Sequence, residues 1–342
     1  MHKFFAVSLP QFAAVLANHN VQLEIVVHQG GRILFPDPDP YEGEEEEEEL
    51  NESQQFSAEY WELLSPVLTK LVLCIEGEIY IDRLHWLSSM QKLQHLELRG
   101  LDHMDGPQPA LFFPRTLSLP AVKVLRLEKF SHIWNRCHLD CPSLEALHLR
   151  ELDGLVMPTG LGSCSRLTTL DIAAARNAVP DADANPGLLA AIESVQTTLE
   201  CLDISGWAPA LNGVFELISR LPRLHTFVAQ RNGLTAVPAL PATLKSLDLR
   251  ANEFTEVPVQ LESLTQLTSL ALSSKDSSVN FQIRRPLDAI ISLPQLQKLT
   301  LVLDSRSHRP AHTIWNARSL HYFGLAKYEI ARSKSSLLTT MP

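Results

Sequence analysis

A spacing of apolar residues, Leu-x-x-Leu-x-Leu, recurs through most of the chain. The four clearest copies are Leu93/Leu96/Leu98, Leu144/Leu147/Leu149, Leu244/Leu247/Leu249 and Leu296/Leu299/Leu301. Seven slightly altered copies are Leu68/Leu71/Leu73, Val122/Leu125/Leu127, Leu167/Leu170/Ile172, Leu199/Leu202/Ile204, Leu224/Phe227/Ala229, Leu267/Leu270/Leu272 and Leu320/Phe323/Leu325. Successive copies begin 20 to 32 residues apart. Such a period indicates stacked repeats, because one short unit cannot bury its own apolar side.

Each copy predicts a short strand followed by a return segment. The fourth and sixth positions are apolar and alternate with polar residues, as in a strand with one buried face. Apolar residues at helical spacing predict helices in the longer return segments, at residues 81–90, 186–196, 211–221 and 286–293. The copies that begin at Leu224 and Leu244 instead predict extended return segments, since Pro238 and Pro258 interrupt them.

The first 66 residues show a different pattern. Ser8 and Gln11 form a capping box with Pro10 in the first turn, which predicts a helix from Ser8 to Asn18. Residues 21–27 alternate as a strand does, and they could be a degenerate first repeat that caps the array.

The domain organisation follows from a change of composition. Residues 36–55 are rich in Pro and Glu and predict a disordered acidic loop, after which 56–64 predict a helix. The expected domains are an N-terminal cap at 1–66 that contains the acidic loop, about eleven repeats at 67–330 and a C-terminal tail at 331–342.

The eleven copies resemble the leucine-rich repeat family over roughly residues 67–330. The resemblance implies an α/β leucine-rich-repeat solenoid, with a curved parallel sheet on the concave face and helices or irregular segments on the convex face. The family usually places Asn or Cys at the ninth position, where the side chain hydrogen-bonds neighbouring turns. Here only Asn232 and Asn252 occupy it, and other copies have Leu101, Leu152, Trp207 or Lys275. We therefore expect an irregular solenoid.

The uneven repeat lengths, and a helix and strand ahead of a long insertion, also resemble the repeat portion of plant and green-algal F-box-type proteins. In those proteins the F-box recruits a ubiquitin ligase and the repeats choose the substrate. About 20 residues precede the first strand here, too few for an F-box domain with its own core. The resemblance implies a non-enzymatic protein-interaction module, and more narrowly a substrate-recognition subunit of a ubiquitin ligase. A structural or cytoskeletal scaffold is a further alternative.

The third, fifth and seventh positions of each strand point away from the core, so they line the concave face. They predict a partner-binding surface of His95, Glu97, Arg99, Arg126, Glu128, His148, Arg150, Asp171, Asp203, Gln230, Asp248 and Arg250. Arginine is favoured at interface hot spots, so we expect an acidic or phosphorylated protein segment to bind the arginines. The alternative is a solvated face whose charges pair with one another.

Composition and charge narrow the function classes. The chain of 342 residues has a formal net charge of −10, and ten carboxylates lie from Asp37 to Glu52 without a Lys or Arg among them. The positive and negative charges of the rest of the chain are balanced, which argues against a nucleic-acid binder or a polybasic membrane anchor.

The acidic loop is either a solvated insertion or a segment that masks the basic residues or docks a basic partner. Apolar runs stay well short of the ~18 residues of a membrane span. Five scattered cysteines are typical of a reducing, cytoplasmic compartment, and we expect a monomer.

Motifs for catalysis are weak. Cys201-Leu202-Asp203 matches the Cys-x-Asp of bacterial effector ubiquitin ligases, which also carry leucine-rich repeats, but it lies within a predicted repeat strand. Cys137 and Cys141 form a single pair, whereas a structural zinc site needs four ligands. Glycine-rich phosphate loops are absent from the sequence. We therefore predict no enzyme activity, metal or cofactor, with the effector-type ligase as the enzymatic alternative.

Overall fold

The computed structural model describes residues 23–29, 65–75, 79–80, 87, 90–101, 111–112, 115–131, 137–152, 157–174, 185–207, 211, 213–254, 258–274, 290, 293–304 and 322–328. The chain divides into two compact units, Met1–Arg166 (unit 1) and Leu167–Pro342 (unit 2). The predicted helices at 8–18 and 56–64 and the acidic loop lie outside the described residues, as do most of the helices predicted at 81–90 and 286–293.

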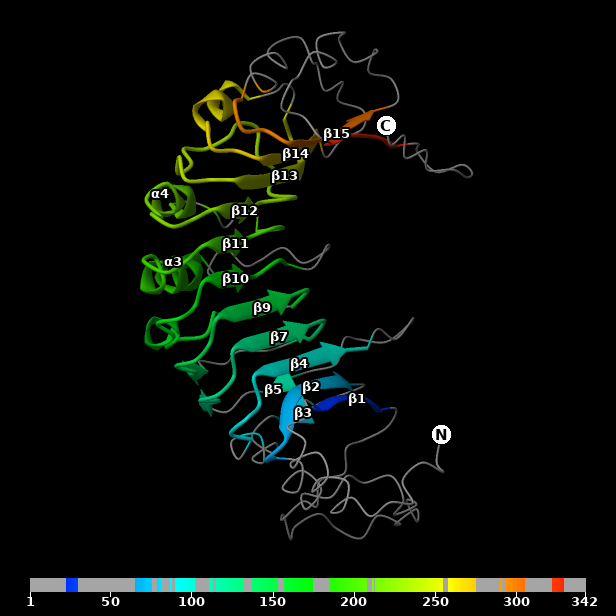
Figure 1. The fold of residues 1–342 in the computed structure, drawn as a ribbon, viewed down its shortest axis with the longest axis vertical. Coiled ribbons are helices and arrows are strands. Elements are labelled where there is room, and N and C mark those ends of the chain that lie inside the picture. Colours follow the sequence, from blue (N-terminus) through cyan, green and yellow to red (C-terminus); the bar gives the residue numbers. More distant parts are fainter. Residues whose placement is uncertain are drawn as a thin grey trace. The chain divides into compact units, whose positions relative to one another are not determined.

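Unit 1 contains a parallel sheet of repeat strands. In spatial order these are β1 (Leu23–Gln29), β2 (Leu68–Ile75), β4 (His95–Gly100), β7 (Val124–Glu128) and β9 (Ala146–Arg150) (Figure 1). The strand predicted at 21–27 is present as β1, two residues further along the chain. It pairs in parallel with β2, the strand of the first clear repeat.

Unit 1 also has two small sheets that the repeat pattern did not predict. They pair β3 (Ile79–Tyr80) with β5 (Leu111–Phe112), and β6 (Thr116–Ser118) with β8 (His138–Asp140). A 3-10 helix (η4, Leu161–Ser163) follows in the next return segment. In the second small sheet Leu117 and Leu139 point into the core while their strand neighbours are exposed, so these segments are amphipathic strands too short to show a periodicity in the sequence.

Unit 2 also contains parallel repeat strands. Its strands lie in chain order: β10 (Thr169–Asp171), β11 (Cys201–Asp203), β12 (Thr226–Val228), β13 (Ser246–Asn252), β14 (Ser269–Ser274), β15 (Lys298–Asp304) and β16 (Tyr322–Tyr328). Helices α3 (Asn185–Ser194) and α4 (Val214–Ile218) precede β11 and β12 and lie on the side where those strands begin (Figure 1).

The return segments of unit 2 confirm part of the helix prediction. Helix α3 matches the prediction at 186–196, whereas α4 is shorter than the predicted 211–221. The segment after Leu224 is extended, as predicted. The next segment corrects the prediction: Pro258 is the N-terminal cap of a 3-10 helix (η6, Val259–Ser263). A proline fits the start of a helix because the first N–H groups have no intrahelical partner, so it begins this helix rather than preventing one.

The repeated leucines form the core in one common register. Residues at the fourth position are Cα partners across neighbouring strands of each unit and are at most 1% exposed: Leu71, Leu96, Leu125 and Leu147 in unit 1, and Leu170, Leu202, Phe227, Leu247, Leu270 and Leu299 in unit 2. Burying each such side chain contributes about 1.5–3 kcal/mol. This confirms the predicted strand and its buried face in both units.

The ninth position closes the turns after β12 and β13 by hydrogen bonding. Asn252 Nδ2 donates to the carbonyls of Ala229 (2.8 Å) and Leu249 (2.9 Å), and its Oδ1 accepts from the backbone N–H groups of Asn232 (2.9 Å) and Leu234 (3.1 Å). Asn232 repeats the pattern one strand earlier.

Trp207 occupies the ninth position of the preceding repeat and makes an equivalent hydrogen bond, although it is not an asparagine. Its indole Nε1–H donates to the carbonyl of Ile172, while Asn232 Nδ2 donates to the carbonyl of Ile204 at 3.1 Å. Ile172 and Ile204 hold the same sixth position in their repeats, so the indole takes over the asparagine amide's bond. Position-by-position comparison with the family pattern missed this role.

Candidate functional site

The outward positions of β4, β7 and β9 place the predicted residues of unit 1 in two rows. Glu97, Arg126 and His148 are Cα partners in one row, and Arg99, Glu128 and Arg150 in the next. We call these six residues the arginine face. Neighbouring strands lie about 4.8 Å apart, so the side chains within a row are in reach of one another. His95 begins a third row, whose other members, Val124 and Ala146, are apolar.

Glu97 departs from the prediction of an exposed outward residue, because it is only 7% exposed. The outward residues of the neighbouring strand β2, Val72 and Cys74, are buried as well. Burial of a carboxylate requires compensation. Glu97 receives it from its own strand: Arg99 donates to its Oε1 at 2.5 Å, and His95 Nε2 lies 3.6 Å from its Oε2.

Arg99 is held by a second carboxylate. Its Nε lies 3.6 Å from Oε2 of Glu128, which comes from the adjacent strand β7. Both glutamates of the arginine face are therefore directed at Arg99. The strand sequence explains this: an acid at position five with an arginine at position seven places the pair on the same side, two residues apart.

Arg126 has the reverse arrangement and remains unpaired. It stands at position five with Glu128 at position seven, and Glu128 turns to Arg99 instead. Within the part of the chain that the structure describes, Arg126 has neither an ion pair nor a hydrogen bond, and its buried Nε lacks an acceptor. Its half-buried side chain thus carries a cation without a counterion at the centre of the arginine face.

Arg126 also acts on the neighbouring imidazole. Burial is the main cause that lowers the pKa of His95 below its ordinary value, and the positive charges of Lys70 and Arg126 lower it further. Glu97 opposes this shift. His95 is therefore kept neutral beside a group of cations, and it does not neutralise Glu97.

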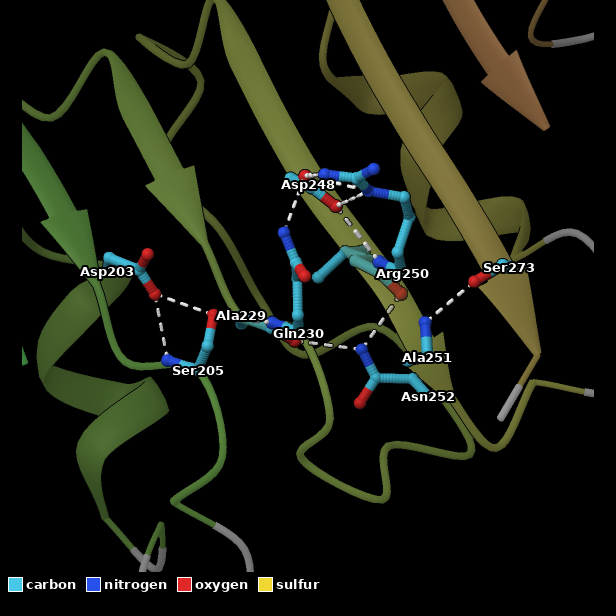
Figure 2. Close-up of polar contacts among 10 residues, drawn as sticks. Asp203, Ser205, Ala229, Gln230, Asp248, Arg250, Ala251, Asn252 and Ser273 are labelled. Atoms are coloured by element: carbon cyan, nitrogen blue, oxygen red, sulfur yellow. Dashed lines mark hydrogen bonds and ion pairs between the residues drawn. The ribbon is translucent and has the colours of Figure 1, made fainter. Parts of the chain in front are cut away.

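The face of unit 2 that points away from the core carries a chain of polar side chains that contact one another. Asp203 accepts hydrogen bonds from the backbone N–H and the hydroxyl of Ser205, at 2.9 and 2.6 Å. The Ser205 hydroxyl oxygen in turn accepts from the N–H of Gln230, whose side-chain amide donates to Asp248 at 2.9 Å. Figure 2 shows how these contacts link β11, β12 and β13. We call them the polar ladder.

Arg250 ends the polar ladder in a double contact with Asp248. Its Nε donates to both carboxylate oxygens at 3.0 Å, and a terminal amino group donates to Oδ2 at 2.6 Å. These hydrogen bonds are the main cause that raises the pKa of Arg250. Asp171, also predicted for the site, is buried and is the register partner of Asp203. The sequence prediction did not include Ser205, whose signal was its place at the seventh position.

Two of the cysteines from the sequence motifs lie in the core, and a third is half-buried in a strand. Cys137 and Cys141 flank β8 with no exposed surface, and burial raises their pKa values to about 11 and about 12. Cys201 and Asp203 are the end residues of β11, on either side of the buried Leu202. Among the described residues, no group of three or more His, Cys, Asp and Glu side chains is arranged to hold a metal ion. No helix in that part of the chain is long and apolar enough to cross a membrane.

The known proteins that resemble this chain are found among solved structures. No family model matches the sequence, and no curated protein does. A leucine-rich-repeat protein of Leptospira interrogans is similar at 18% identity and a TM-score of 0.46, over 78% of this chain and 74% of that chain. Listeria monocytogenes InlP is similar at 17% identity and a TM-score of 0.36, over 72% of this chain and 58% of that chain.

The fold rests on the chain's own contacts. Every copy of the motif forms a strand, the strands of each unit are parallel, and the fourth-position residues keep one buried register. Two asparagines at the ninth position bond neighbouring turns. The described part of this chain therefore has the α/β leucine-rich-repeat fold.

Proposed function

We propose that this protein is a non-enzymatic protein-interaction module that binds its partner through the arginine face of unit 1. The observation that carries the proposal is Arg126, a half-buried cation on the open face of the sheet without a counterion in the described residues. Its buried Nε has no acceptor in the described structure, and its terminal amino groups are open to a ligand that would supply the counterion. Arg250 in the polar ladder of unit 2 differs, because Asp248 already supplies its counterion.

A protein is favoured over a nucleic acid as the partner. The arginine face interleaves three arginines with two glutamates, whereas a phosphate backbone requires a surface of one sign. The apolar Val124 and Ala146 lie in the row beside these charges, and arginine is enriched at protein interfaces.

A narrower role is a substrate-recognition subunit of a ubiquitin ligase, acting as a monomer in the reducing cytoplasm. It is supported by the resemblance of the repeats and by the five cysteines, all of which are free thiols. Co-purification with ubiquitin-ligase subunits is the expected result. Formation of a ubiquitin thioester on Cys201 would contradict this role and establish the effector-type enzyme.

Site-specific photo-crosslinking tests the binding face. A benzophenone amino acid replaces Val124 or Ala146 on the strand face and, as the control, the exposed Thr116 on β6. The full chain is then irradiated in a lysate of the organism that makes it. We expect the same cross-linked protein from Val124 and Ala146 and none from Thr116. Cross-linking from Thr116 alone would place the interface on the other side of the unit.

A further inference from the structure

Resting on the proposed function, we infer that the partner supplies a single carboxylate, an Asp or Glu side chain in an acidic segment, which binds the guanidinium of Arg126. Five N–H donors in a fixed plane match the two oxygens of a carboxylate. Three features of the arginine face point to a carboxylate: the partners of the nearby glutamates, the accessible N–H donors of Arg126 and the net charge of the face.

The carboxylates near Arg126 are directed at other side chains. Glu97 lies beside Arg126 in the same row, but Arg99 donates to its Oε1 and the imidazole of His95 lies against its Oε2. Glu128, two residues along the strand from Arg126, lies against Arg99 Nε. Neither glutamate comes within ion-pair distance of Arg126 in the described structure.

The donors left over point to a ligand from outside. The Nε of Arg126 is buried without an acceptor, whereas the two terminal amino groups are not buried and have no acceptor among the described residues. A ligand therefore meets the outer edge of the guanidinium, where two parallel N–H donors face solvent. A carboxylate there makes two charge-assisted hydrogen bonds. The half-buried setting makes those bonds stronger than on a fully exposed rim.

The charge of the face selects a monoanion. The three arginines and two glutamates of the arginine face have a formal excess of one positive charge. One carboxylate neutralises this charge. A phosphate monoester carries about −1.5 to −2 at pH 7 and would be repelled by Glu97 and Glu128 in the two rows that flank the site. The structure thus favours an acidic segment over a phosphorylated one.

The test follows the Nε–Hε signal of Arg126 in the ¹⁵N-labelled full chain by NMR, with Arg126→Lys used to assign it. The probes are three blocked pentapeptides, Gly-Ser-X-Ser-Gly, in which X is Glu, Gln or phosphoserine. We expect a saturable shift with the Glu peptide at low ionic strength and at least about tenfold weaker binding of the Gln peptide, a difference of about 1.4 kcal/mol. In Arg126→Met, which lacks this signal and is followed by the backbone amide signals of β7, the Glu-over-Gln preference should be lost, whereas the matched control Arg250→Met should keep it.

Several results would overturn the inference. Equal shifts with the Glu and Gln peptides would remove the carboxylate site, and tenfold tighter binding of the phosphoserine peptide would make the ligand a phosphate. Binding of the Glu peptide only after Glu44–Glu49 are changed to Gln would assign the site to this chain's own acidic segment. Cross-linking from Val124 and Ala146 does not depend on these results, so failure of the carboxylate inference and failure of the proposed function remain distinguishable.

Discussion

The two units build the same strand from the same motif, yet they use the polar positions around it in opposite ways. In unit 2 the ninth position carries Trp207, Asn232 and Asn252, which bond neighbouring turns, and the open face carries the polar ladder. In unit 1 the buried Phe130 and Leu152 occupy the ninth position after β7 and β9, and the open face leaves Arg126 without a counterion among the described residues. In unit 2 these polar groups bond to one another, whereas in unit 1 Arg126 is left for the binding role proposed above.

The order of charges along the strand differs between these pairs. Asp248 with Arg250 and Glu97 with Arg99 each place the acid at position five and the arginine at position seven, and both pairs close on themselves. Arg126 with Glu128 has the opposite order, and no ion pair joins them in the described structure.

The largest expected effect comes from removing the side-chain amide of Asn252 at the ninth position in unit 2. Asn252→Leu leaves two N–H groups and two carbonyls at a buried turn without their partner. Each unsatisfied buried group costs about 1–3 kcal/mol, so the free energy of unfolding should fall by at least ~4 kcal/mol in urea titrations. The matched apolar change in unit 1, Leu152→Met, should cost less than about 1.5 kcal/mol. Equal losses of stability in Asn252→Leu and Leu152→Met would show that the ninth position contributes alike in the two units.

The core should not distinguish the units. Leu147→Ala in unit 1 and Leu247→Ala in unit 2 remove side chains that are 0% and 1% exposed at the same motif position. Both should lower the free energy of unfolding by about 2–5 kcal/mol. If one of the two variants were as stable as the parent protein, the shared register would be wrong in that unit.

A smaller loss is expected from the indole of unit 2. Trp207→Phe keeps an aromatic side chain but removes the donor to the Ile172 carbonyl. A buried acceptor without its partner costs about 1–3 kcal/mol, to be measured as the change in the free energy of unfolding. An unchanged free energy of unfolding would mean that the indole contributes by packing alone. The ninth-position hydrogen bonds that stabilise the turns would then be those of Asn232 and Asn252.

The smallest effect is a pH dependence that belongs to unit 1. The pKa of folded His95 lies below its ordinary value of 6.5, so the unfolded chain takes up a proton that the folded chain resists. Stability contributed by neutral His95 is present above that value and is lost as pH falls below it. His95→Gln should therefore lose less stability between pH 7 and pH 5.5 than the parent does. The same loss in both proteins would show that His95 does not titrate in this way.

The sequence predicted the strands and the core, because a repeated apolar spacing acts through burial alone. It also predicted which side chains share the open face, and in unit 1 the rows Glu97–Arg126–His148 and Arg99–Glu128–Arg150 follow from that register. It did not predict which charges pair, since Glu128 could reach either of two arginines and only the side-chain geometry assigns it to Arg99. Trp207 was missed for a similar reason, because its family position implied an amide.

The most direct test of the contrast compares Arg126→Met with Arg250→Met by urea unfolding of the full chain. Arg250 contacts Asp248 but is 42% exposed, so screening limits its loss to about 0.5–1 kcal/mol. Arg126→Met should leave the free energy of unfolding unchanged or raise it, because an unpaired cation is removed from a half-buried site. A loss of more than about 1 kcal/mol in Arg126→Met would contradict the account, since Arg126 would then be a structural residue like Arg250.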